Sequence, residues 1–147
     1  DDPRMSPVIP TQPQTRAEMV RACVHYRDGR KVADLDIEAI SDVLEVDDGS
    51  FVWVGLYEPD DALLAKMQEE FDLHPLAVED ALKAHQRPKI EAYGDGLFIV
   101  IHTAQASAAC EIGMGETHIF VGPRYLVTVR HGASHSYSTA RERCEQN

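Results

Sequence analysis

One run of residues limits the choice of fold more than any other. Phe51–Tyr57 (FVWVGLY) is apolar or aromatic at both odd and even positions. A strand with one wet face alternates apolar and polar side chains, whereas a strand covered on both faces is apolar throughout. The run therefore predicts a central strand whose sheet has helices on both of its faces.

Segments whose apolar residues repeat at helical spacing lie before and after this strand in the sequence. Ile37–Leu44 repeats its apolar residues with a helical period, with Asp36 as the expected N-cap. The segment after Pro59-Asp60-Asp61 places Leu63, Leu64, Met67 and Phe71 in one apolar stripe. A further helix is predicted to start at His74-Pro75 and to run to about Ala84, because Pro fits a first helical turn and Arg87-Pro88 blocks continuation.

Three hairpins complete the pattern. The first joins two short strands around Asp28-Gly29, the second joins Ile90–Tyr93 to Leu97–His102 through a three-residue turn, and the third joins Glu116–Val121 to Tyr125–Arg130. The segment Ala104–Gly115 is expected to be a loop of small residues. The order of elements predicts the α/β class, with a mixed parallel and antiparallel central sheet between helical layers.

The 147 residues are about the size of one domain, since domains commonly take roughly 100–200 residues. Residues 1–15 carry Pro3, Pro7, Pro10 and Pro13, which favour an extended tail. Residues 16–147 form the expected domain. Its last segment, Ser134–Asn147, is a Ser-capped helix that stops after roughly two and a half turns, so we expect a fragment of a longer protein.

Charge and composition narrow the possible partners. The formal net charge of −11 opposes binding to nucleic acid or to an anionic lipid surface, and it favours cations or basic proteins. The longest apolar stretches, Phe51–Tyr57 and Leu97–Ile101, fall far short of the roughly 18–20 residues that cross a bilayer. Cys23, Cys110 and Cys144 are too widely spaced to indicate a disulfide framework or a thiolate metal site.

The sequence gives no support for an enzyme. Its serines lack the Gly-x-Ser-x-Gly setting of a nucleophile elbow, and no Gly-rich phosphate loop precedes a helix. The seven histidines include no HExxH pair, and His131 and His135, although four residues apart, flank a predicted strand exit. His102 and His118 lie in apolar strands, where we expect satisfied structural roles.

Two adjacent carboxylates are the strongest candidate site. Glu79 and Asp80 lie on the predicted helix after His74-Pro75, and both are expected to point outward, away from its apolar side. From residue types alone, this pattern fits a solvated helix face. It also fits two carboxylates that each give oxygen to a hard cation such as Mg²⁺, completed by water or by a second chain.

A longer succession of motifs resembles a known family. Phe71–Leu82 (FDLHPLAVEDAL), His85–Glu91 (HQRPKIE) and Leu97–Ile101 (LFIVI) are similar to the cytosolic N-terminal domain of CorA-type magnesium and cobalt transporters. Trp53–Leu56 before them and Tyr125–Val129 after them lie where similar segments lie in that family. The likeness covers roughly residues 20 to 145.

The resemblance implies an α/β domain on the cytoplasmic face of the inner membrane. In that family the domain continues into a long helix and two membrane helices, and five copies form a channel for Mg²⁺, and for Co²⁺ in some members. Asp80 then matches one carboxylate of a regulatory Mg²⁺ site between subunits, and Glu79 matches the neighbour linked to a second site. A zinc-transporting branch, with Zn²⁺ in place of Mg²⁺, and a separate small binding module are the alternatives.

Overall fold

The computed structural model describes residues 15–106, 111–132 and 137–146. Its strands form a seven-stranded sheet in the order β2-β1-β3-β7-β6-β5-β4. The strands are β1 Val20–Arg27, β2 Arg30–Asp34, β3 Ser50–Tyr57, β4 Lys89–Tyr93, β5 Gly96–Ala106, β6 Ile112–Val121 and β7 Tyr125–Gly132. The β3–β7 pair is parallel and the other neighbouring pairs are antiparallel, which confirms the predicted mixed sheet.

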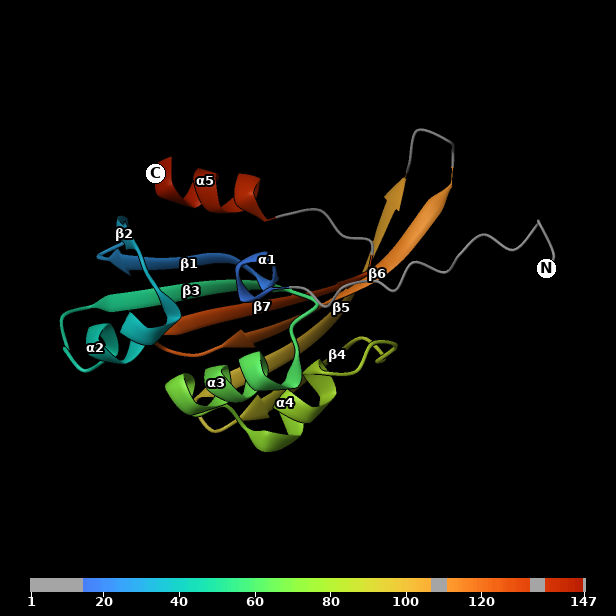
Figure 1. Ribbon diagram of the computed structural model, residues 1–147, viewed down its shortest axis with the longest axis horizontal. Coiled ribbons are helices and arrows are strands. Elements are labelled where there is room, and N and C mark those ends of the chain that lie inside the picture. The colour runs from blue at the N-terminus through green and yellow to red at the C-terminus, as the bar shows by residue number, and fades with distance from the viewer. Residues whose placement is uncertain (1–14, 107–110, 133–136, 147) are drawn as a thin grey trace, which may run out of the picture.

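Helices lie on both faces of the sheet (Figure 1). The helical elements are α1 Arg16–Met19, the 3-10 helix η1 Ile37–Ala39, α2 Ile40–Leu44, α3 Asp61–Phe71, α4 Pro75–Ala81 and α5 Ser138–Gln146. Helices α3 and α4 cover one face, whereas α5 lies on the opposite face, where the Tyr26 hydroxyl donates to Glu145 at 2.8 Å. Of the described helices, none has the length and apolar character needed to traverse a bilayer.

The main core lies between the sheet and the layer formed by α3 and α4. Its buried members include Val52, Val54, Leu56, Leu63, Leu64, Met67, Ala77, Val78, Phe98, Val100, Val127 and Val129. On the other face of the sheet, Ile90 of β4 and Leu97 of β5 are 71% and 43% exposed. Within the described residues, the second helical layer therefore covers only part of the sheet.

The central strand is where the sequence placed it, since β3 lies between β1 and β7. Its two faces are not equally buried, however. Val52, Val54 and Leu56 are fully buried against the helices, whereas Phe51 and Trp53 on the α5 side are half-buried. The apolar run thus predicted the position of the strand correctly and overstated the burial of its outer face.

Local capping explains where the helices begin. The side chain of Asp60 accepts the Leu63 backbone N–H at 2.8 Å and caps the start of α3. His74 starts α4 by accepting the Leu76 N–H at its Nδ1. The prediction for Asp36 was wrong in detail, because its side chain makes no capping hydrogen bond to η1.

Three predicted boundaries were also wrong. Helix α4 ends at Ala81 rather than near Ala84, and the turn between β4 and β5 has two residues, because Gly96 already belongs to β5. The predicted loop Ala104–Gly115 is largely strand in its described part, since β5 reaches Ala106 and β6 begins at Ile112. Residues 1–14, Cys110 and His135 lie outside the described residues, so the predicted tail stays a prediction, as does the interpretation that His131 and His135 are not a metal-ligand pair.

Arg124 joins the turn between β6 and β7 to the segment that precedes β3. Its guanidinium donates to the carbonyl oxygens of Leu44 at 2.6 Å, Val46 at 2.7 Å and Ser50 at 3.2 Å. Because Arg124→Ala leaves these carbonyls without their donors, we expect the free energy of unfolding to fall by about 2 kcal/mol in urea titrations. The exposed control Arg30→Ala should change it by less than about 0.5 kcal/mol; equal losses would contradict the role of Arg124.

Candidate metal-binding site

Helix α4 carries the two predicted carboxylates on different sides. Ala77, Val78 and Ala81 are buried against the core. Glu79 faces solvent, with 60% of its side chain exposed, whereas only 29% of the Asp80 side chain is exposed. The expectation that both point outward is right for Glu79 and wrong for Asp80, which turns toward the edge of the sheet at β4.

Glu79 makes a contact that is ordinary for a surface helix. Its Oε1 lies 3.2 Å from the Nζ of Lys83, one turn further along the chain. Exposed pairs at this spacing contribute little to stability, because water screens both charges. Glu79 is therefore a solvated carboxylate that is free to exchange its cationic partner.

Asp80 has a more specific partner. Its Oδ2 accepts from the Nζ of Lys89 at 2.7 Å, and the same Nζ lies 2.7 Å from Oε1 of Glu91. Glu91 also accepts a hydrogen bond from the Tyr93 hydroxyl. The hydrogen bonds to Asp80 and Glu91 raise the pKa of Lys89, so the ammonium stays charged between its two carboxylates.

Lys89 was not predicted as part of this site, although it lies inside the motif His85–Glu91 (HQRPKIE). Its position follows from the fold. Lys89, Glu91 and Tyr93 alternate along β4 on the side that faces the helices, and the ammonium of Lys89 lies 5.7 Å from the ring centre of Phe98 on β5. One lysine thus occupies the position beside Asp80 that a bound cation would take.

The described residues supply only part of a possible metal site. Among the described residues, no group of three or more His, Cys, Asp or Glu side chains is arranged to hold an ion. A hard cation at Asp80 would therefore complete its shell with water or with oxygen atoms from another chain. Mg²⁺ suits such an arrangement, because it binds through one or two carboxylates and keeps several of its waters.

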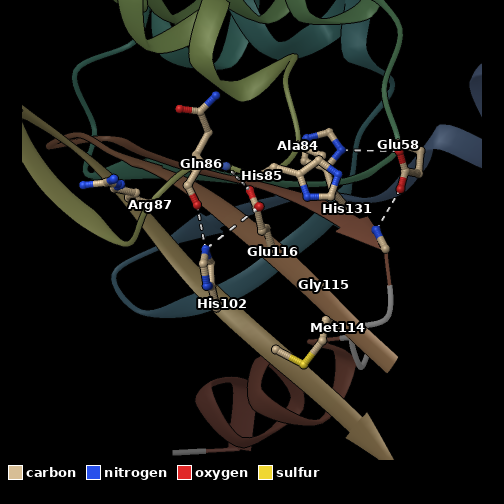
Figure 2. Close-up of a pocket in the computed structure, with 11 residues that line it drawn as sticks. Glu58, Ala84, His85, Gln86, Arg87, His102, Met114, Gly115, Glu116 and His131 are labelled. Carbon is tan, nitrogen blue, oxygen red and sulfur yellow. Dashed lines mark hydrogen bonds and ion pairs between the residues drawn. The ribbon is translucent and has the colours of Figure 1, made fainter. Parts of the chain in front are cut away.

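A second group of polar side chains lines a cavity of about 500 Å³ between the residues that follow α4 and the sheet (Figure 2). Glu116 accepts from the Gln86 backbone N–H at 3.2 Å and from His118 Nε2 at 2.9 Å. His102 lies beside them, with its Nε2 4.0 Å from Glu116. The hydrogen bonds to Glu116 outweigh its burial and lower its pKa.

His118 departs from its predicted role as a satisfied strand residue. Its ring is fully buried, and its Nδ1 has no hydrogen-bond partner among the described residues. His102 is satisfied, since its Nε2 lies 2.6 Å from the Gln86 carbonyl oxygen. Only the three-dimensional packing distinguishes these two histidines, because both alternate in the same way along their strands.

Comparison with known proteins identifies the family of the chain. The model of the family described as "CorA-like Mg2+ transporter protein" matches residues 48–147. YfjQ of Bacillus subtilis (strain 168), a protein named provisionally as a metal ion transporter, is 33% identical over 100 residues, covering 68% of this chain and 30% of YfjQ. The chain belongs to the CorA-like family, as the sequence motifs predicted.

The "Cobalt/magnesium transport protein CorA" of Thermotoga maritima is 36% identical over 76 residues. That match covers 49% of this chain and 20% of the Thermotoga protein. The chain thus spans less than a third of the length of these relatives. Both relatives bear the names of transporters rather than enzymes.

Solved structures support the fold. The full-length CmaX protein superimposes with a TM-score of 0.71 at 14% identity, covering 88% of this chain and 40% of CmaX. The soluble domain of CorA from Methanocaldococcus jannaschii superimposes with a TM-score of 0.54 at 16% identity, and the match covers 85% of this chain and 46% of the CorA domain. The ZntB cytoplasmic domain from Vibrio parahaemolyticus superimposes with a TM-score of 0.61 at 11% identity, and the match covers 87% of this chain and 50% of the ZntB domain. The mixed sheet with its helices is therefore the fold of CorA and ZntB soluble domains.

Proposed function

We propose that this chain is the regulatory domain of a divalent cation transporter and that it senses Mg²⁺ through Asp80 at a contact between subunits. The observation that carries the proposal is the pairing of Asp80 with Lys89 at 2.7 Å, where each side chain is partly exposed. A carboxylate held by one flexible ammonium group can exchange that group for a hydrated metal ion. Membership of the CorA-like family supports transport as the activity of the whole protein.

The physical mechanism is charge compensation between acidic surfaces. The chain has a net charge of −11, so neighbouring copies repel one another unless cations lie between them. Mg²⁺ bound by Asp80 and by acidic groups of an adjacent copy would offset this repulsion and hold the assembly closed. Loss of Mg²⁺ would restore the repulsion, loosen the contact and shift the population toward the open state. Glu79 would supply a second, more exposed carboxylate nearby.

The ligand chemistry favours Mg²⁺ over the alternatives. Asp80, Glu79 and Glu91 offer hard carboxylate oxygens, which suit Mg²⁺, whereas Zn²⁺ and Co²⁺ bind well to imidazole nitrogen. Co²⁺ stays beside Mg²⁺ as a candidate for the transported ion, because the Thermotoga relative is named a cobalt/magnesium transport protein. Zn²⁺ is the alternative, in keeping with the similarity of fold to the ZntB cytoplasmic domain. The remaining alternative, a separate small binding module, has no comparable support from the relatives.

The proposed assembly is a homopentamer with this domain on the cytoplasmic face of the inner membrane, where it meets cellular Mg²⁺. The partners of the domain are then further copies of the same chain and divalent cations. The membrane contact belongs to the remainder of the proposed longer protein.

Flux measurements test this proposal. The full-length protein is reconstituted in lipid vesicles, and metal entry is followed with a fluorescent indicator while Mg²⁺ is varied on the side that carries this domain. We expect Mg²⁺ flux that falls as Mg²⁺ on that side rises. Parallel runs with Co²⁺ and Zn²⁺ identify the preferred ion. Vesicles without metal flux, or with flux that ignores Mg²⁺ on the domain side, would contradict the proposal.

A further inference from the structure

Four ionisable side chains gather where the loop formed by residues 82–88 crosses the sheet. They come from three adjacent strands and lie on the face that the helices cover. They are His102 of β5, Glu116 and His118 of β6, and His131 of β7. The loop joins α4 to β4 and borders the cavity shown in Figure 2.

Three of these side chains hold the main chain in place at and just before this loop. Glu116 accepts the Gln86 N–H at 3.2 Å, and the Nε2 of His102 lies 2.6 Å from the Gln86 carbonyl oxygen. The Nε2 of His131 lies 2.7 Å from the carbonyl oxygen of Ala81, at the end of α4. Because a carbonyl oxygen only accepts, both histidines donate through Nε2.

His118 connects this network to the interior. Its Nε2 donates to Glu116 at 2.9 Å, and its ring is fully buried against Phe98 and against His131, with the His131 ring centre 5.1 Å away. Its Nδ1 is buried and has no partner in the described parts of the chain. A proton added at Nδ1 would therefore be a buried donor without an acceptor, on a cation enclosed by the protein.

We propose that this cluster is a proton-operated latch: His118 gains its second proton only when residues 82–88 leave Glu116, so acidification below neutral pH opens the loop. The proposal depends on the contacts of the fold and does not depend on the proposed function. It assigns a role to a buried polar network that takes no part in the proposed metal binding at Asp80.

The charged groups around His118 come from every element packed near it. Burial is the largest influence and lowers the pKa of His118, and the neighbouring His131 lowers it further. Glu116 and Asp80 of α4 raise it and only partly offset the burial. Further titratable side chains face these groups: Lys89 lies at Asp80, Glu58 at His131 and His102 at Glu116.

The direction of the pH effect follows from these shifts. His118 has a lower pKa in the closed form than the ordinary value of 6.5, which an opened loop would restore. The open form therefore binds more protons, and the closed form loses stability as pH falls below about 6.5. The pKa of Glu116 is also lowered in the closed form, so protonation of Glu116 in more acidic solution further destabilises the closed form.

Amide hydrogen exchange of the 147-residue chain tests the latch. Protection of the amides in residues 82–88, corrected for intrinsic exchange, is compared at about pH 7.5 and about pH 5.5. Because the closed form excludes the second proton of His118, we expect protection to fall about fivefold at the lower pH. His118→Gln, which keeps a donor for Glu116 and cannot titrate, should make the protection independent of pH.

A matched control separates opening of residues 82–88 from a loss of stability of the whole domain in acid. His25 is also a buried histidine with a lowered pKa, but it bonds to Ser50 far from the loop. His25→Gln should keep the fivefold response.

Proton NMR of His118 in the unmodified chain gives a second readout, with a neutral Nε2-protonated ring expected at about pH 6.5. A loop response that is absent, or that vanishes equally in both variants, or a His118 that is half-protonated at that pH, would overturn the proposal.

Discussion

Replacing Phe98 with alanine is expected to lower the free energy of unfolding by about 3–5 kcal/mol, the range for removing a large aromatic side chain from a packed core. Phe98 is 1% exposed, and its ring centre lies 5.0 Å from that of Phe120 and 5.9 Å from that of His118. The side chain fills the space between the sheet and the layer of α3 and α4. Its loss leaves a cavity that rigid neighbours can close only in part.

Urea denaturation followed by the fluorescence of Trp53, the single tryptophan, measures this change. The control is Ile90→Ala on the adjacent strand. Ile90 is 71% exposed, so its substitution should change the free energy of unfolding by less than about 0.5 kcal/mol. If the two variants lost equal stability, the assignment of the core to the α3 and α4 side of the sheet would be wrong.

Under the proposed function, Asp80→Asn in the full-length protein is expected to raise the Mg²⁺ concentration at which flux is half-inhibited by about tenfold or more, since even indirect metal contacts commonly contribute that much. The amide keeps the shape of the carboxyl group and loses its charge. The flux assay with Mg²⁺ on the domain side provides the measurement. If this Mg²⁺ concentration did not change, Asp80 would not be a ligand of the regulatory Mg²⁺.

Lys89→Gln should act in the opposite direction. The ammonium of Lys89 lies 2.7 Å from both Asp80 and Glu91, so under the proposed function it would compete with Mg²⁺ for these carboxylates. A partly exposed ion pair that contributes about 1 kcal/mol corresponds to roughly a fivefold change in affinity. Removing the lysine should therefore lower the half-inhibiting Mg²⁺ concentration about fivefold in the same assay. A rise would mean that Lys89 assists closure rather than competing with the metal ion.

Much of the fold was predictable because its signals are local. The stripe of Leu63, Leu64 and Met67 and the Asp60 cap define α3 without reference to the rest of the chain. The extent of β5 and β6 was not predictable in this way. Their outer halves, which include Ala104 and Gly115, are weak strand formers and are ordered by continuous pairing from Leu97 opposite Val121 to Ala106 opposite Ile112.

The candidate site was predictable only in part for a related reason. Helical spacing placed Glu79 and Asp80 on α4, but it could not show that Asp80 meets a lysine nine residues later, across a loop and at the start of another strand. The same limit applies to His118, because alternation in a strand does not show which ring nitrogen finds a partner. Contacts between separate elements decide both cases.

The central claim is that Asp80 binds Mg²⁺ in the assembled protein. Equilibrium dialysis of the full-length oligomer measures it directly, as Mg²⁺ bound per subunit at subsaturating concentrations. The control Asp95→Asn removes the same charge from the exposed turn between β4 and β5. The account predicts reduced Mg²⁺ binding for Asp80→Asn and normal binding for Asp95→Asn. Asp80→Asn protein that binds as much Mg²⁺ as the unmodified protein would contradict it.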